Sequence, residues 1–253
     1  GKLAVVEPEK LFEYMQTDFI VEGEGEVALV KLVRELEGDQ QFENVDGLAW
    51  RDSDGRVQSH GEAPTIDNLS DYKIPYEKFD MDGYVEKVNV QSPNVRSLNM
   101  LSSRGCPFSC TFCNFSTLRS PMRYYDDLES QLDYLVDNFQ IKHVTFNDDI
   151  FTVNQKHVEK VCKLLKERAL TFSVSSRIDF LKKQTIETLE SSGCRYLCVG
   201  IESPAPKVAA VVDKKLNMSK LQDNMDLLAT SRIVVNYGFI IGYLGETEET
   251  IRE

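Results

Sequence analysis

The chain has 253 residues, of which 42% are hydrophobic and 28% charged, with only 14 Gly and 8 Pro. This composition excludes a disordered or collagen-like chain and predicts a packed core, in one large domain or a domain and a half. The formal charge of −12 disfavours a nucleic acid as the partner, although a local basic cleft would be compatible with one.

Two further features concern the location of the protein. The sequence has no stretch approaching the roughly 18–20 uncharged apolar residues of a membrane span, so no membrane partner is expected. Its six cysteines are far too few for a disulfide scaffold of this size. We therefore expect a reducing, cytoplasmic environment.

The first forty residues predict one strand and one helix. Residues 18–21 form the strand, and a Glu/Gly run follows them. The helix after this run carries Leu29, Val33 and Leu36 and is closed by Gly38. The run itself is also compatible with a plain turn before a helix.

A hairpin and a linker come next. Residues 45–51 and 56–59 flank a Ser-Asp-Gly sequence at 53–55, which is typical of a hairpin turn. Residues 64–75 are polar and rich in turn formers, which predicts a linker.

From residue 98 onward, apolar strands alternate with amphipathic helices. Five strands are predicted, at 97–101, 144–146, 171–175, 196–201 and 233–241. The helices are expected over 126–139, from Asn154, around Ile186 up to Gly193, from Ser219 and from Thr247. Asp126 is the expected N-cap of the first helix, with Glu129 as its capping-box partner. The last two strands are almost continuously apolar, which predicts that they are buried.

Repeated βα units argue for a parallel sheet that curls into a full or partial barrel. A closed eight-stranded barrel needs roughly 250 residues, whereas only about 155 follow residue 98. The predicted fold class is therefore α/β, with a partial barrel of about five βα units. Since the chain stops at the start of a helix, we expect a fragment of a longer protein.

Three cysteines lie together on one loop after the first of these strands. Cys106, Cys110 and Cys113 have the spacing C-x3-C-x2-C. Three thiolates can coordinate three irons of a cubane and leave the fourth iron open, whereas a structural zinc site closes with four ligands. No fourth Cys or His lies near the three in the sequence, which favours an open iron–sulfur site over zinc or over three unrelated thiols.

This loop, placed after the first strand of a βα series, resembles the radical S-adenosylmethionine (SAM) superfamily, including the aromatic residue before the third cysteine, here Phe112. The resemblance covers most of the chain after Ser97 and implies a (β/α)6-type barrel. It further implies that the three thiolates hold a [4Fe–4S] cluster whose open iron binds SAM. One-electron reduction of SAM would then give methionine and a 5′-deoxyadenosyl radical.

The resemblance also assigns SAM contacts to the ends of the following strands. Asp148 would accept from the SAM amino group, and Arg177 would bind its carboxylate. Glu202 and Ser203 would bond the ribose hydroxyls, and the backbone at Ile240 would meet the adenine. Each of these residues also has a plainer interpretation, as a solvated turn, a surface arginine or ordinary strand residues.

The amino-terminal part resembles the stretch that joins a cobalamin-binding domain to the radical SAM core. This predicts three segments: the remnant of a Rossmann-like, cobalamin-binding-like α/β domain (1–40), a hairpin and linker (41–96), and a radical SAM core incomplete at its carboxyl end (97–253). The D-x-H-x-x-G motif of cobalamin domains is absent from the sequence. Cobalamin is therefore expected only together with an upstream part of the protein.

The predicted function is a radical SAM enzyme, of methyltransferase or oxidoreductase type, that acts on a small metabolite and receives electrons from flavodoxin or ferredoxin. No protein side chain is assigned a catalytic role of its own. One alternative is a methylthiotransferase-like enzyme acting on tRNA or protein, but such enzymes carry further cysteines ahead of the three. The other alternative is a non-catalytic zinc or iron–sulfur module.

Overall fold

The computed structural model describes residues 7–85, 95–113, 120–214 and 220–252. The chain divides into two compact units, residues 1–72 with 113–120 and residues 73–112 with 121–253. Across the described ranges, every helix is too short or too polar to span a lipid bilayer.

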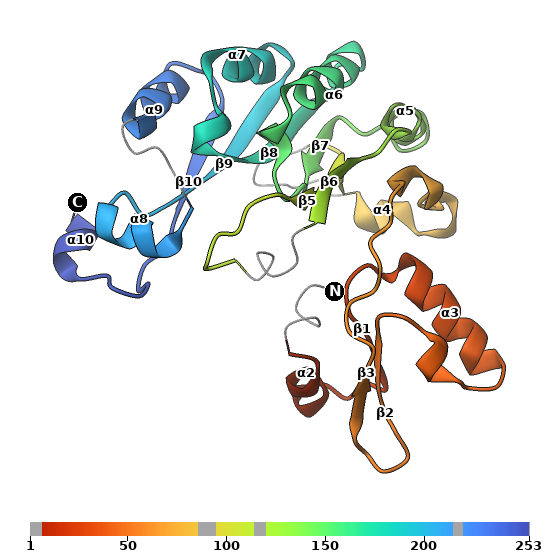
Figure 1. Ribbon diagram of the computed structural model, residues 1–253. Helices are drawn as coiled ribbons and strands as arrows, with labels where there is room; N and C mark the ends of the chain where they lie inside the picture. The colour runs from red at the N-terminus through yellow and green to blue at the C-terminus, as the bar shows by residue number, and fades with distance from the viewer. Residues whose placement is uncertain (1–6, 86–94, 114–119, 215–219, 253) are drawn as a thin grey trace. The chain divides into compact units, whose positions relative to one another are not determined.

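The described residues of the first unit include a small antiparallel sheet and the helices α2 and α3 (Figure 1). Its elements are α2 (Pro8–Tyr14), β1 (Phe19–Val21), α3 (Gly25–Glu37), β2 (Leu48–Arg51) and β3 (Val57–Ser59). Strands β2 and β3 form the predicted hairpin, and β1 pairs antiparallel with β2. The predicted strand at 18–21 and the predicted hairpin therefore belong to one sheet.

Helix α3 buries a different face from the one marked by the apolar residues singled out in the sequence. Ala28 and Leu32 are buried in a cluster with Leu48 of β2. By contrast, Leu29 is 56% exposed and Val33 is 46% exposed. The apolar spacing predicted the helix correctly but did not identify its buried side.

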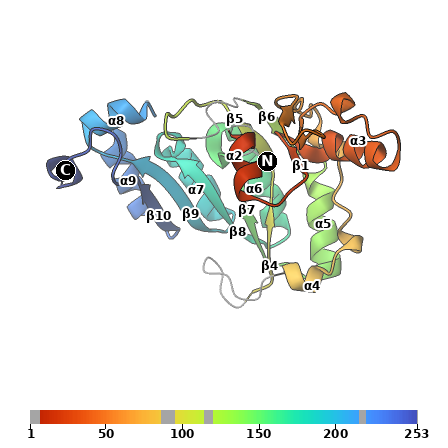
Figure 2. The same ribbon diagram turned by 90° about the horizontal axis from the view of Figure 1, so that it is seen from below.

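The second unit is built on a five-stranded sheet in the order β10-β9-β8-β7-β4, with every neighbouring pair parallel (Figure 2). Its strands are β4 (Ser97–Met100), β7 (His143–Phe146), β8 (Thr171–Arg177), β9 (Cys194–Glu202) and β10 (Val234–Phe239). Its helices are α4 (Met81–Tyr84), α5 (Leu128–Phe139), α6 (Gln155–Glu167), α7 (Lys183–Ser191), α8 (Pro206–Val212), α9 (Leu221–Ala229) and α10 (Glu248–Arg252). The predicted α/β class and the series of about five βα units are confirmed.

Helices α6, α7 and α9 lie along one face of this sheet (Figure 1). Helix α6 begins where predicted, because the Asn154 side chain accepts hydrogen bonds from two backbone N–H groups of the first turn. Its inward residues Val158, Val161 and Leu165 are fully buried. Burial of each such side chain contributes roughly 1.5–3 kcal/mol, so packing on the sheet stabilises this helix more than its cap does.

Three local predictions need correction. The N-cap of α5 is Asp127 rather than Asp126, because the helix starts at the fully buried Leu128. An unpredicted strand pair, β5 (Ser103–Cys106) and β6 (Ser120–Tyr124), flanks the cysteine loop. Strand β10 is largely exposed rather than buried, because among the described strands it pairs with β9 alone. The predicted cap Ser219 lies outside the described residues.

The buried histidine of β7 is expected to lower the stability of the folded protein at acid pH. The His143 ring is fully buried and bonds the hydroxyls of Thr171 and Ser173, each at 2.9 Å. Burial, helped by the Arg195 charge, lowers the pKa of His143 to about 4. The unfolded chain therefore takes up this proton near pH 6.5 while the folded protein does not, and stability is lost as the pH falls from about 6.5 towards 4.

We expect the free energy of unfolding of the wild type to fall by about 2 kcal/mol more than that of His143→Gln between about pH 7.5 and pH 5. Urea titrations at several pH values measure this difference. Parallel pH profiles for the two proteins would contradict the assignment.

Candidate functional site

The cysteine loop follows β5 and contacts helix α8. Cys106 ends β5, and Cys110 is buried. Thr111 donates its backbone N–H to Val212 O at 3.1 Å and its hydroxyl to Val211 O at 2.8 Å. The adjacent Phe112 packs against the buried apolar cluster of this helix. The predicted aromatic position is thus an anchor for the loop.

The turn after β7 contacts the backbone just ahead of the cysteines. Asp148 is 4% exposed and accepts from Ser102 N at 2.7 Å, Ser102 Oγ at 2.5 Å and Ser103 Oγ at 2.6 Å. Ser102 Oγ also lies 2.8 Å from Nε2 of His157, and the next residue, Asp149, accepts from Gly105 N at 3.0 Å. Burial raises the pKa of Asp148, against the opposing effect of these hydrogen bonds. Its predicted contact with the SAM amino group stays a prediction.

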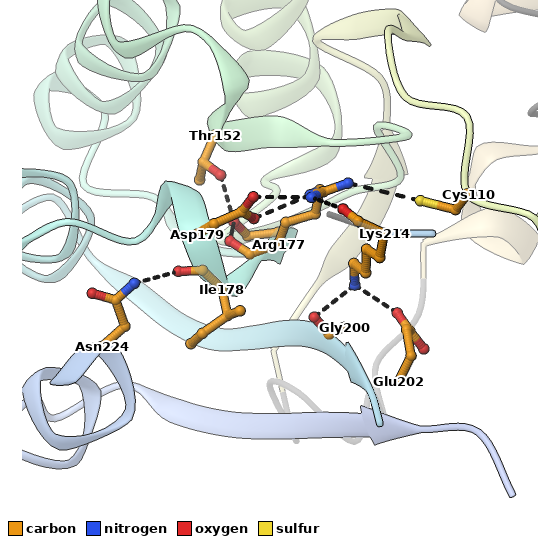
Figure 3. Close-up of polar contacts among 10 residues, drawn as sticks. Cys110, Thr152, Arg177, Ile178, Asp179, Gly200, Glu202, Lys214 and Asn224 are labelled. Carbon is orange, nitrogen blue, oxygen red and sulfur yellow. Dashed lines mark hydrogen bonds and ion pairs between the residues drawn. The ribbon is translucent and has the colours of Figure 1, made fainter. Parts of the chain in front are cut away.

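Arg177 ends β8 and points towards the cysteine loop (Figure 3). Its Nε and Nη2 atoms donate to the two carboxylate oxygens of Asp179 at 3.0 and 2.9 Å. Nη2 also donates to Lys214 O at 2.6 Å, and Nη1 lies 3.7 Å from Cys110 Sγ. The side chain is 8% exposed, so it is a buried residue rather than a plain surface arginine.

Glu202 ends β9 in a buried ion pair (Figure 3). Lys214 Nζ donates to Glu202 Oε1 and to Gly200 O, both at 2.7 Å, and Lys214 is 6% exposed. A Cβ at position 200 would overlap the Glu202 carboxylate and lie 2.7 Å from Lys214 Nζ, so any larger residue there would displace this ion pair. Glu202 itself adopts a φ of 70°, which is uncommon for a residue with a side chain and is held by these contacts.

The remaining predicted contacts lie beside this pair. Ser203 is buried, and its hydroxyl accepts from Ala205 N at 3.3 Å. Ile240, just after β10, donates its backbone N–H to Glu202 O at 2.8 Å. The ends of β9 and β10 are therefore joined, and the predicted residues on these two strands are neighbours.

Sequence reasoning missed Lys214 and the partners of Asp148. Ser102 and Ser103 lie 46 and 45 residues before Asp148, His157 lies 55 residues after its partner Ser102, and Lys214 lies 12 residues beyond Glu202. None of these positions interrupts a strand or helix pattern. The one available signal was the pair of small polar residues directly ahead of the cysteine loop.

The donor chemistry of the loop fits an iron–sulfur cluster. All six cysteines lie in the described part of the chain, and none of them is in a disulfide. Three thiolates are the ligand set of a [4Fe–4S] cluster with one open iron. Among the residues that the structure describes, no group of three His, Cys, Asp or Glu side chains is close enough together to hold a metal ion. The assignment of Cys106, Cys110 and Cys113 as ligands stays a prediction.

Comparison with known proteins identifies the family. The model of the Radical SAM superfamily matches residues 100–253, which is more than half of the chain. The chain therefore belongs to the radical SAM superfamily. This confirms the predicted family and identifies an enzyme domain whose cofactors are a [4Fe–4S] cluster and SAM.

Three similar proteins illustrate the relationship. An uncharacterized methyltransferase of Pyrococcus horikoshii is 29% identical over 92% of this chain and 51% of its own length. The anaerobic magnesium-protoporphyrin IX monomethyl ester cyclase of Cereibacter sphaeroides is 28% identical over 93% of this chain and 40% of its own length. The apo structure of the cobalamin-dependent SAM radical enzyme OxsB has a TM-score of 0.80 at 22% identity, over 98% of this chain and 36% of that one. The chain thus spans about half, or less, of the length of these proteins.

Proposed function

We propose that this chain is the SAM-cleaving part of a cobalamin-associated radical SAM enzyme, which performs methyl transfer or related radical chemistry on a small metabolite. The observation that carries the proposal is the C-x3-C-x2-C loop, which contacts the turn after β7 and the end of β8, in a superfamily member. A reduced [4Fe–4S] cluster bound there would supply the electron that cleaves SAM.

The chain's own residues would hold and orient the two cofactors. Cys106, Cys110 and Cys113 would be the cluster ligands, and Phe112 would fix the loop on α8. Glu202 and Ser203 would face the ribose of SAM, and the backbone at Ile240 would face its adenine. The hydrogen bond that joins Ile240 to Glu202 supports a shared role for these two strand ends.

The cobalamin association is proposed from the amino-terminal part. Residues 1–40 would be the end of a cobalamin-binding-like domain and 41–96 its connection to the core at 97–253. The likeness to a cobalamin-dependent enzyme over nearly the whole chain supports this arrangement. Since this chain lacks the histidine motif, cobalamin would be held by an upstream part of the protein.

The methylthiotransferase alternative would need further cysteines ahead of the three, and residues 1–105 of this chain supply none. The name of one curated relative, the anaerobic magnesium-protoporphyrin IX monomethyl ester cyclase, supports chemistry on small molecules instead. A flavodoxin or ferredoxin would supply the electron. The low cysteine content supports a reducing, cytoplasmic location.

The test is reductive cleavage of SAM. The protein that carries this sequence should be purified and reconstituted anaerobically, and should then bind about four irons and four sulfides per chain. After reduction by dithionite it should form 5′-deoxyadenosine and methionine, measured by chromatography. A reconstituted protein that holds one zinc and no sulfide, or a cluster-loaded protein that neither binds nor cleaves SAM, would overturn the proposal.

A further inference from the structure

The guanidinium of Arg177 has most of its N–H donors engaged by the protein. A guanidinium carries five N–H groups. Asp179 takes two of them, Lys214 O a third and Cys110 Sγ a fourth. Fork-like binding of a SAM carboxylate needs two parallel N–H groups, and this arrangement leaves one.

Arg177 also contacts the cysteine loop at a second point. Its guanidinium carbon lies 4.0 Å from the ring centroid of Phe108, two residues before Cys110. The Phe108 ring in turn packs on Phe180, with centroids 5.6 Å apart. One buried cation therefore touches both an aromatic ring of the loop and one of its sulfur atoms.

We propose that Arg177 is a positioning residue for the iron–sulfur cluster rather than a ligand of the SAM carboxylate, and that its N–H···S contact with Cys110 raises the reduction potential of the cluster. The inference rests on the proposed function, because it needs Cys110 to be a cluster ligand. Asp179 fixes the plane of the guanidinium through two hydrogen bonds, and Lys214 O accepts a third from Nη2, one of the two nitrogens that bind Asp179.

The electrostatic reason lies in the charge of the reduced cluster. Reduction adds one electron to the iron–sulfur unit and its thiolates. A donor N–H and a positive charge close to one thiolate stabilise the reduced form more than the oxidised form. Burial of Arg177 strengthens the effect, since water does not screen the pair as it would at the surface.

Redox titration of the reconstituted protein, followed by EPR in the absence of SAM, tests this inference. In Arg177→Met the ratio of reduced to oxidised cluster at a fixed potential should fall by about tenfold, which is a shift of about 59 mV for a one-electron couple. Arg177→Lys keeps the charge and should recover part of the shift. Asp179→Asn removes the neutralising carboxylate and should shift the potential in the opposite direction.

Two further measurements separate this role from the alternatives. Arg195→Met removes one charge at an exposed position of β9 and should leave the potential unchanged. SAM affinity of Arg177→Met should stay within twofold of wild type. Three results would overturn the inference. The first is a reduction potential that neither Arg177→Met nor Arg177→Lys changes, and the second is a shift of the potential in the same direction in Arg177→Met and Asp179→Asn. The third is a tenfold loss of SAM affinity in Arg177→Met without a shift of the potential.

If Arg177→Met does not retain four irons, the redox titration of Arg177→Lys tests the effect of Arg177 on the reduction potential. A wild type that assembles no [4Fe–4S] cluster would instead refute the proposed function itself.

Discussion

Cys110→Ala should bind roughly tenfold less iron and sulfide after anaerobic reconstitution than the wild type, and its reductive cleavage of SAM should fall to background. The cubane would lose one of its three protein ligands, and loss even of residues that only support metal ligands weakens binding 10–100-fold. Cys106→Ala and Cys113→Ala should behave alike. Iron and sulfide analysis, together with EPR of the reduced protein, measures the loss.

Cys162 provides the matched control. It is buried in α6, and burial raises the pKa of its thiol to about 12, so it stays protonated and is a poor metal ligand. Cys162→Ala should therefore keep the full cluster and its activity, apart from a modest loss of stability. Retention of nearly four irons by Cys110→Ala, or equal loss in the Cys162 variant, would contradict the ligand assignment.

The regular elements of the second unit were predictable because each depends on local signals. Asn154 caps α6 as expected, and Gly193, with a φ of 101°, follows the end of α7. The alternation of strands and helices predicted a parallel sheet, and in the structure each strand of this sheet lies beside the one that precedes it in the βα series. These features need no knowledge of residues that are distant in sequence.

The site was predictable in outline only. Parallel strands bring their carboxyl ends to one edge, so the sequence directed attention to the polar residues there, and their contacts with SAM stay a prediction. Which groups bond one another depends on burial and side-chain direction, which the sequence pattern does not contain. The Asp148 hydrogen bonds, the Glu202–Lys214 pair and the Arg177–Cys110 contact each join different elements. The strand β10 was predicted, but its exposure was not, because an apolar sequence is the same for a strand at the edge and for one at the centre of a sheet.

Asp148→Ala should destabilise the second unit by about 2–4 kcal/mol, which is one of the largest losses expected from a single substitution in this chain. Three donors, two from Ser102 and one from Ser103, would lose their buried acceptor, and each unsatisfied buried group costs roughly 1–3 kcal/mol before side chains rotate to new partners. Thermal or urea unfolding measures the change. Alanine at the exposed Asp137 of α5 should leave stability within about 0.5 kcal/mol of wild type.

Asp148→Asn distinguishes the hydrogen bonds from the charge. The amide keeps an acceptor for Ser102 N–H, and its NH₂ can donate to the two hydroxyls, so its loss at neutral pH should be smaller than that of alanine. Because burial raises the pKa of Asp148, the folded protein takes up this proton at higher pH than the unfolded chain does. The stability difference should therefore shift in favour of the wild type as the pH falls from neutrality towards about 4. A pH-independent difference would contradict a buried, hydrogen-bonded carboxylate.

The same pair of variants decides what Asp148 contributes to the site. If Asp148 chiefly anchors Ser102 and Ser103 ahead of Cys106, Asp148→Ala should lose cluster iron along with stability, and Asp148→Asn should retain both. If its main partner is the SAM amino group, both variants should keep the cluster, and both should bind SAM more weakly. The three donors already on the carboxylate favour the first result. Iron content and SAM affinity measured on the same samples separate the two roles, because anchoring acts on the loop before SAM arrives.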